Sequence, residues 1–319
     1  MKAMLLTGKN TFALRDIPAP VLNDDSLMVQ VEACAICNAT DLRVVEADDP
    51  TTVWPKKPWP VLLGHEMCGT IVGMGPKVEG WSIGERVAGF FIGCQGFAEY
   101  AAVPADKGAI YRIPSSMPSH EAAVLELVTG TLSYCMPKDN VDVPGPNRDV
   151  FIVGLGPAGL FYVQECRNLG FSAIYASDRH EQRRALAKKF GATKLFHPDE
   201  DPFGALGSGS VDVVVDTTGK ESLVPNYLKI LRPGGVIIPF GVGIDWAKFE
   251  AGMKAKEIKL ARGHGERLRA AKAVIEPWLA NGSLDIASVI TKRIHLEEIA
   301  DALRLLKERK EIKVVVDIK

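Results

Sequence analysis

The segment that most constrains the fold is residues 149–178, DVFIVGLGPAGLFYVQECRNLGFSAIYASD. A β-branched and aromatic run leads into a turn with three glycines, and a helical pattern follows from Leu160 to Leu169. This order is typical of a dinucleotide-binding unit, in which one glycine allows the sharp turn, one lets the backbone approach a pyrophosphate and one lets the helix pack on the strand. The helix N-terminus adds unpaired N–H groups for the phosphates. The turn residues expected to bind the nucleotide are Gly154, Gly156, Pro157, Ala158 and Gly159.

Asp178 ends the second apolar run, about twenty positions after the last glycine, where such units place the acid that binds the ribose. Its carboxylate can accept hydrogen bonds from the 2′-hydroxyl of NAD. Against the 2′-phosphate of NADP it would meet like charge, at roughly 4 kcal/mol per charge pair for 4 Å and a dielectric near 20. NAD is therefore the expected cofactor. Arg179, Arg183 and Arg184 keep NADP open as the less favoured choice, because an adjacent arginine can offset the repulsion.

Bulk composition excludes several classes of partner. The chain has 319 residues, with 38 Lys+Arg against 39 Asp+Glu, so net charge does not favour nucleic acid or an anionic membrane. The N-terminal MKAMLLTGKN has too short an apolar run for a signal peptide, and no other run is long enough to span a bilayer. We therefore expect a cytoplasmic protein with no membrane and no nucleic-acid partner. Its six cysteines show no disulfide-scaffold spacing.

The pattern of apolar and polar residues changes near Asp149. Residues 1–35 alternate apolar and polar over short runs between turn clusters, which favours β-structure. Residues 119–136 are expected to be helical, with Ser119 as the cap. Beyond Asp149, strand and helix patterns alternate, which predicts a parallel sheet covered on both faces. The expected α/β fold comprises a β-rich domain (1–120), a doubly wound nucleotide-binding domain (121–283) and a C-terminal return to the first domain (284–319).

A second group of chemically active residues lies in the N-terminal half, in ACAICNATDLR (33–43) and LLGHEMCGTIVGMG (62–75). Cys37, His65 and Glu66 offer a thiolate, an imidazole and a carboxylate, a set that suits a catalytic zinc with three protein ligands and one open position. Each residue alone would more often be packing or a satisfied polar group. Cys34 makes a CxxC with Cys37, but one such pair is weak evidence for a structural zinc site.

These motifs together resemble the zinc-dependent medium-chain dehydrogenase family, the alcohol dehydrogenases and their relatives. The resemblance rests on Cys37 with Thr40 and Asp41, the Gly-His-Glu at 64–66 with its glycine-rich strand, GERV (84–87), FAEY (97–100) and the glycine turn, in order along nearly the whole chain. It implies a GroES-like catalytic domain and a Rossmann domain, with substrate, zinc and nicotinamide meeting in the cleft.

The resemblance implies Cys37 and His65 as zinc ligands, with Glu66 or Glu126 completing the set. Glu126 stands where polyol, sugar and threonine dehydrogenases of the family have a glutamate and ethanol-type enzymes have a cysteine. Cys37, Thr40, His65 and Glu66 are the expected catalytic residues, and Thr217, Gly241 and Val242 at later strand ends are expected to hold the nucleotide. Relatives are dimers or tetramers, so a homo-dimer or homo-tetramer is implied.

Four departures from the family pattern stand out. Only nine residues and one cysteine, Cys94, occupy positions 88–96, where the family has its structural-zinc lobe, so a second zinc is not expected. One extra residue separates Cys37 from Thr40, which affects the hydrogen-bond reach that Thr40 needs for proton transfer. Arg43 stands at the relay histidine position. Leu127 replaces the usual proline after Glu126.

The expected activity is reversible hydride transfer between an alcohol and NAD(P), with one zinc per chain acting as a Lewis acid. The substrate is expected to be a small secondary alcohol, sugar or polyol. Trp54, Trp59, Phe90 and Phe91 are candidates for lining its pocket. Two alternatives remain open: a metal-free quinone or ene reductase of the same superfamily, and a non-enzymatic nucleotide-binding protein.

Overall fold

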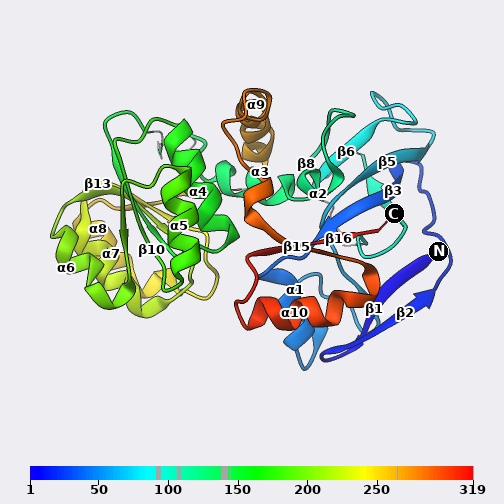
Figure 1. Ribbon diagram of the computed structural model, residues 1–319, viewed down its shortest axis with the longest axis horizontal. Coiled ribbons are helices and arrows are strands. Elements are labelled where there is room, and N and C mark those ends of the chain that lie inside the picture. Colours follow the sequence, from blue (N-terminus) through cyan, green and yellow to red (C-terminus); the bar gives the residue numbers. More distant parts are fainter. Residues whose placement is uncertain (91–94, 106–108, 138–142, 144, 264, 319) are drawn as a thin grey trace. The chain divides into compact units, whose positions relative to one another are not determined.

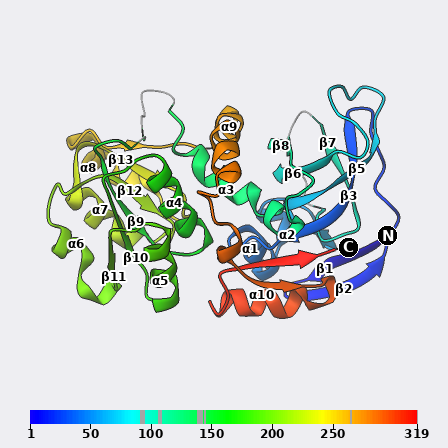
Figure 2. The same cartoon turned by 45° about the horizontal axis from the view of Figure 1, so that its top comes forward.

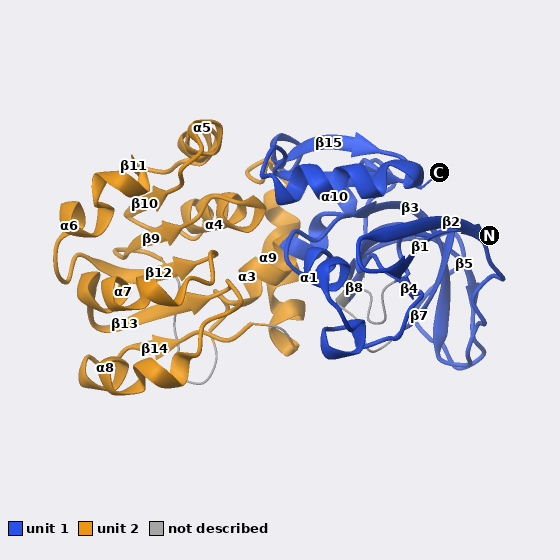
Figure 3. Cartoon of the chain, turned by 90° about the horizontal axis from the view of Figure 1, so that it is seen from below, with its two compact units in different colours: residues 1–127, 286–319 blue, residues 128–285 orange. Residues whose placement is uncertain are grey.

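The computed structural model describes residues 1–90, 95–105, 109–137, 143, 145–263 and 265–318. The chain forms two compact units, one of residues 1–127 and 286–319 and one of residues 128–285 (Figure 3). The first unit is therefore built from both ends of the chain. Among the described residues, no helix is both long and apolar enough to cross a bilayer.

The second unit is organised around a six-stranded sheet with the order β11-β10-β9-β12-β13-β14. All neighbouring strands in it run parallel. Because β9 pairs with both β10 and β12, the strand order reverses at β9, and ligands of such sheets bind beyond the carboxyl ends of the strands at this point. The strands are β9 (Asp149–Val153), β10 (Ala173–Ser177), β11 (Lys194–Phe196), β12 (Val211–Asp216), β13 (Leu231–Pro239) and β14 (Lys259–Leu260).

Helices cover both faces of this sheet (Figure 1). Helix α4 (Pro157–Asn168) packs on β9 and β10 beside α5 (Glu181–Phe190). The other face holds one apolar cluster to which α6 (Pro202–Leu206), α7 (Val224–Ile230) and α8 (Glu250–Ala255) contribute. Double coverage explains the uninterrupted valine run of β12, since a strand buried on both sides has no polar face. The predicted parallel sheet is confirmed. Two further helices are α3 (Leu125–Ser133) and α9 (Glu266–Ala280).

The first unit is mainly antiparallel. Its larger sheet has the order β15-β16-β3-β5-β6-β8, with β7 also paired to β3, and its smaller sheet has the order β2-β1-β4. Strand β16, red in Figure 2, brings the C-terminal end of the chain onto β3. The strands are β1 (Lys2–Gly8), β2 (Thr11–Asp16), β3 (Ser26–Ala35), β4 (Val61–Leu62), β5 (Glu66–Met74), β6 (Arg86–Phe90), β7 (Tyr100–Pro104), β8 (Ala109–Arg112), β15 (Ile290–Ile294) and β16 (Lys313–Asp317).

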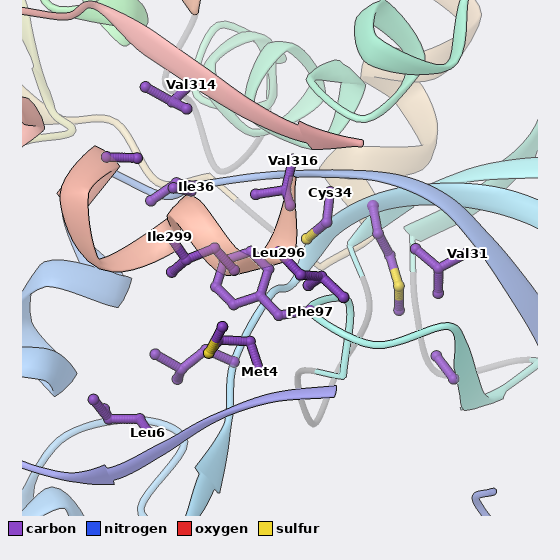
Figure 4. Close-up of a cluster of buried hydrophobic side chains, with 14 of the residues drawn as sticks. Met4, Leu6, Val31, Cys34, Ile36, Phe97, Leu296, Ile299, Val314 and Val316 are labelled. Carbon is purple, nitrogen blue, oxygen red and sulfur yellow. The ribbon is translucent and has the colours of Figure 1, made fainter. Parts of the chain in front are cut away.

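The core of the first unit joins residues from both ends of the chain (Figure 4). Helix α10 (Ile299–Lys307) buries the positions 299, 302, 303 and 306, the spacing of an amphipathic helix. Cys34 lies fully buried in the same cluster, and an added Cβ at Gly64 or Gly96 would come within 2.8 or 2.5 Å of its sulfur. Cys34 is therefore a packing residue of the core. The remaining helices of this unit are α1 (Thr40–Glu46) and α2 (Ser119–Ala122).

Ser119 is the first residue of α2 and not its cap, so that expectation was wrong. Pro118 occupies the cap position, and α2 ends before α3 begins. The Ser119 hydroxyl donates to Glu32 at 2.7 Å and accepts from Arg86 at 3.0 Å. The hydroxyl therefore hydrogen-bonds both members of the Arg86–Glu32 ion pair, in which a guanidinium nitrogen lies 2.7 Å from a carboxylate oxygen. The short 3₁₀ helices of the chain are η1 (Pro50–Thr52), η2 (Pro198–Glu200), η3 (Glu221–Leu223), η4 (Trp246–Phe249), η5 (Ala287–Val289) and η6 (Leu296–Glu298).

Candidate active site

Cys37 lies in the short loop that links β3 to α1. The loop is folded by two local hydrogen bonds: the Cys37 N–H donates to Oδ2 of Asp41 at 2.8 Å, and the Thr40 N–H donates to Sγ of Cys37 at 3.3 Å. The second of these hydrogen bonds fixes the position of the sulfur. The extra residue between Cys37 and Thr40 is thus accommodated within a loop that fixes the sulfur.

His65 and Glu66 are buried where β5 begins. Gly64 before them has φ of +95°, and an added Cβ there would lie 2.8 Å from both the Cys34 sulfur and the Phe97 nitrogen. Only glycine fits this backbone, which sets the direction of the two side chains after it. The Trp54 ring meets the His65 ring edge-on, with centroids 5.4 Å apart.

The loop and the strand bring three donor atoms together. The Cys37 sulfur, a ring nitrogen of His65 and a carboxylate oxygen of Glu66 all lie within 4.8 Å of one another. Thiolate, imidazole and carboxylate are the ligand types of catalytic zinc, and three protein ligands leave one position open. The chemistry of this donor set therefore fits a zinc ion.

Asp41 lies behind His65. It is fully buried, and its Oδ1 is 3.8 Å from Nδ1 of the imidazole. Burial raises the pKa of Asp41 to about 6, although His65 and the hydrogen bond from Cys37 oppose that shift. The 3.8 Å separation from Nδ1 is too long for a hydrogen bond, so Asp41 acts on the imidazole through its charge. Asp41 thus accepts a hydrogen bond from the Cys37 backbone and lies close to the His65 ring.

Lys313 reaches the same place from β16. Its Nζ lies 2.8 Å from one oxygen of Glu66 and 2.6 Å from the other, and it donates to the Ile36 carbonyl at 2.9 Å. Both side chains are buried. Burial disfavours the ammonium, yet the Glu66 carboxylate raises the pKa of Lys313 above its ordinary value. The charge of Glu66 is therefore already compensated within the protein.

Glu126, on the first turn of α3, is a partly buried neighbour of this group and not a member of the 4.8 Å cluster. Burial and the Glu66 carboxylate raise its pKa to about 7, while His65 and Lys313 act in the opposite direction. Arg43 is exposed on α1. Cys94 and Phe91 lie outside the described residues, as does the side chain of Phe90.

The glycine turn of the second unit shows three different environments. Gly154 has φ of +91°, and an added Cβ would lie 2.6 Å from Oγ1 of Thr217. At Gly159 it would lie 2.0 Å from the Gly154 carbonyl, so α4 packs tightly on the turn. Gly156 has no atom within 4 Å of that position, which leaves its backbone open to a ligand. Pro157 begins α4, and Ala158 is buried beside it.

Asp178 follows β10 and is largely buried. Its Oδ2 accepts from the Leu155 N–H at 2.8 Å, and its Oδ1 accepts from the His180 N–H at 2.8 Å and lies 2.8 Å from the His180 ring nitrogen Nδ1. Burial alone would raise the pKa of Asp178, but these hydrogen bonds and Arg183 hold it below its ordinary value. Asp178 therefore carries a charge that adjacent donors partly offset. Arg179 beside it is exposed.

Thr217, Gly241 and Val242 follow β12 and β13 at the same edge of the sheet. The Thr217 hydroxyl donates to the Val153 and Gly154 carbonyls at 3.0 and 3.1 Å, which ties this loop to the glycine turn. Val242 is 57% exposed, an unusual position for a large apolar side chain. All the predicted nucleotide residues thus lie beyond the carboxyl ends of β9, β10, β12 and β13.

Comparison with known proteins agrees with both halves of this description. Residues 23–115 match the alcohol dehydrogenase GroES-like domain, and residues 157–269 match the zinc-binding dehydrogenase domain. The chain belongs to the zinc-type medium-chain dehydrogenase family. The predicted resemblance and the predicted GroES-like and Rossmann fold are both confirmed.

Individual relatives of this dehydrogenase are distant but match over their full length. L-threonine 3-dehydrogenase of Aeromonas hydrophila is 25% identical over 95% of each chain. A Sinorhizobium meliloti protein described as a zinc-binding dehydrogenase, solved with NADP bound, is 26% identical over 99% of each chain, with a TM-score of 0.83. Galactitol-1-phosphate dehydrogenase from Escherichia coli shares the fold at 21% identity over 100% of each chain, with a TM-score of 0.80. The chain is an oxidoreductase of the dehydrogenase type.

The sequence did not predict Lys313 as part of this candidate site, and it assigned no separate role to Asp41. Lys313 lies 247 positions from Glu66, so no local pattern connects them. The detectable signal was a lysine directly before three valines in the strand KVVVD. In the structure this lysine and the three valines are buried. Asp41 was noticed only as part of a motif, and its contact with Cys37 and its position behind His65 emerge from the folded loop.

Proposed function

We propose that this dehydrogenase reversibly oxidises a small secondary alcohol, sugar or polyol to the carbonyl compound, with a zinc ion and NAD. The observation that carries the proposal is the approach of Cys37, His65 and Glu66 to within 4.8 Å, in a chain that also has the complete glycine turn. Zinc held there would supply Lewis-acid polarisation of the substrate oxygen. A metal-free reductase would have no use for this donor set.

Cys37 and His65 are the proposed constant ligands, because among the described residues neither is held in an ion pair as close as the one between Glu66 and Lys313. The Thr40 N–H fixes the sulfur, and Asp41 lies behind the imidazole. The third ligand is a carboxylate of Glu66 or Glu126. Glu66 is closer in the structure, but Lys313 already binds both of its oxygens and competes with a cation. We therefore propose that either carboxylate completes the set, with Glu126 as the ligand when Lys313 holds Glu66.

Substrate contact is proposed for Trp54 and Thr40. Trp54 is 38% exposed and lies against His65, so its ring can border a molecule at the open position of the metal. Thr40 is partly buried directly after the Cys37 loop, and its hydroxyl is the proposed proton donor and acceptor for the substrate oxygen. Arg43 is exposed, which favours a proton route through water.

The nucleotide is proposed to bind at the carboxyl edge of the parallel sheet, with its pyrophosphate at Gly156 and its adenosine ribose at Asp178. The charge on Asp178 favours NAD over NADP. The S. meliloti relative was solved with NADP, so both nucleotides belong in the test. The substrate class follows from Glu126 and from relatives such as L-threonine 3-dehydrogenase, whose name indicates oxidation at a secondary carbon. A homo-dimer or homo-tetramer and a cytoplasmic location stay predictions.

A panel of secondary alcohols, sugars and polyols, assayed with NAD and with NADP by the absorbance of the reduced nicotinamide, tests the proposal. We expect turnover with at least one substrate class, a preference for NAD, and loss of turnover after chelation that zinc restores. Turnover that survives both chelation and Cys37→Ala would overturn the zinc assignment. Absence of nucleotide binding would overturn the enzyme assignment as a whole.

A further inference from the structure

Asp216, the last residue of β12, places a fully buried carboxylate beneath the carboxyl edge of the parallel sheet. Its Oδ1 accepts from the Thr218 N–H at 3.0 Å, from the Thr218 hydroxyl at 2.7 Å and from the Tyr227 hydroxyl at 3.0 Å. Its Oδ2 accepts from the Gly219 N–H at 3.0 Å. Four donors from one loop and one helix thus converge on a single side chain.

All four of these donors are neutral. In the part of the chain that the structure describes, no lysine, arginine or histidine forms an ion pair with Asp216. A buried carboxylate is costly unless donors replace its water, and backbone N–H groups that converge on an anion do so. Such hydrogen bonds are also stronger than those between neutral groups. The arrangement therefore gives the loop 217–219 one firmly held conformation.

The loop 241–243 is locked to the same residue. The Gly241 N–H donates to the Asp216 carbonyl at 2.7 Å, and an added Cβ at Gly241 would lie 2.3 Å from the Gly219 nitrogen. An added Cβ at Gly219 would lie 2.0 Å from the Val242 carbonyl. The two loops are thus in direct backbone contact, with no room for any residue but glycine at the contact points.

The glycine turn completes the connection, because the Thr217 hydroxyl donates to the Gly154 carbonyl at 3.1 Å. We propose that Asp216 is a positioning residue for the nicotinamide nucleotide: it holds the loops 217–219 and 241–243 in register with the glycine turn without touching the nucleotide. This role rests on the proposed function, since it presupposes that the nucleotide binds at this edge. It assigns a nucleotide-affinity role to a residue outside the glycine turn and distinct from Asp178.

Asp216→Asn tests the proposal against a matched substitution on the same strand, Asp212→Asn. Asp212 accepts from the Asp149 N–H at 2.8 Å and pairs with Arg232, so it has a comparable structural role away from the carboxyl end of β12. In Asp216→Asn, the amide presents N–H groups to donors that need an acceptor, and the loop must rearrange. We expect the dissociation constant for NADH, measured by fluorescence titration, to rise about ten-fold or more in Asp216→Asn. In Asp212→Asn it should stay within about two-fold of the unmodified chain.

Kinetics and melting temperatures separate positioning from general damage. We expect Asp216→Asn to raise KM for NAD while KM for the alcohol stays unchanged, and both variants to lower the melting temperature. Equal NADH affinity in Asp216→Asn and Asp212→Asn would overturn the positioning role while leaving the proposed function intact. If the unmodified chain bound neither NADH nor NADPH, both proposals would fall together.

Two milder variants decide the question if Asp216→Asn does not fold. Tyr227→Phe and Thr218→Val each remove one hydroxyl donor to Oδ1 and preserve the Asp216 charge. Each should weaken NADH binding by a few-fold in a folded protein, because one of four hydrogen bonds is lost. Unchanged NADH affinity in both variants, with native melting behaviour, would overturn the proposal.

Discussion

The two units of this dehydrogenase bury acidic side chains in different ways. In the first unit, burial and the Glu66 carboxylate together raise the pKa of both Asp41 and Glu126, and of these three acids Lys313 is paired with Glu66 alone. In the second unit, Asp216 and Glu165 are each held by neutral donors. Asp216 has four neutral donors, and Glu165 on α4 has the Thr131 hydroxyl at 2.6 Å.

The first site carries negative charge that its own residues do not fully compensate, whereas neutral donors hold the second site in a fixed shape. Three carboxyls around one ammonium leave surplus negative charge, which a divalent cation can neutralise. Asp216 and Glu165 need no cation, because neutral donors compensate the first and a bound proton the second. Under the proposed function, the first unit supplies the electrostatics of the reaction and the second supplies a fixed surface for the nucleotide.

Lys313→Met should give the largest change in stability. It leaves the Glu66 carboxylate buried without its counter-charge, and breaking a buried pair in this way costs about 3–5 kcal/mol. Thermal unfolding should show a clear loss, and adding Glu66→Gln in the double variant should recover much of it. Lys310→Met, which breaks an exposed pair with Glu308, is the control and should cost under about 1 kcal/mol. Similar losses in Lys313→Met and Lys310→Met would contradict the charge balance described for the first unit.

Glu165→Gln tests whether buried Glu165 of the second unit is protonated in the folded protein. The Thr131 hydroxyl is 2.9 Å from the Val128 carbonyl as well as 2.6 Å from Glu165, and its one proton can serve only one of them. A protonated Glu165 satisfies both contacts by donating to the hydroxyl. Burial accordingly raises the pKa of Glu165 well above its ordinary value.

The sign of the pH dependence follows from that shift. Above about pH 4.5 the unfolded chain releases the Glu165 proton while the folded chain keeps it, so stability falls with rising pH by up to about 1.4 kcal/mol per unit. Glu165→Gln lacks this contribution. The melting temperature of Glu165→Gln minus that of the unmodified chain should therefore increase as the pH rises from 5 to 8. A constant difference over that range would show that Glu165 is ionised in the folded protein.

Asp178→Ser tests whether charge or shape sets the choice of nucleotide. Removing the carboxylate removes its repulsion of a 2′-phosphate and leaves the exposed Arg179 nearby. We expect the ratio of kcat/KM for NAD to that for NADP to fall about ten-fold, less than full Coulomb repulsion would give, because His180 and Arg183 already offset part of the charge. Asp199→Ser, at an exposed acid after β11, should leave the ratio unchanged. An unchanged ratio in Asp178→Ser would assign nucleotide choice to other residues.

The same contrast explains what the sequence could predict. The glycine turn is a local feature whose strand, turn and helix are set by neighbouring residues, so Gly154, Gly156 and Gly159 were found from spacing alone. The candidate metal-binding group comes from a loop and the start of a strand, and its charged neighbours Glu126 and Lys313 come from a helix and the C-terminal strand. Cys37 and His65 were proposed from their ligand chemistry and supported by the family pattern, and Lys313 was not recognisable at all. Ser119 was misread because its hydroxyl serves Arg86 and Glu32, two partners distant in sequence.

The zinc content of the purified chain tests the central claim most directly. Elemental analysis should be made on the unmodified protein, on Cys37→Ala, and on Cys166→Ala, which removes a buried cysteine of the second unit as a matched control. The account predicts one zinc per chain in the unmodified protein and in Cys166→Ala, and loss of that zinc together with nicotinamide-linked oxidation in Cys37→Ala. Zinc retained at one per chain in Cys37→Ala, or no zinc in any of the three, would contradict it.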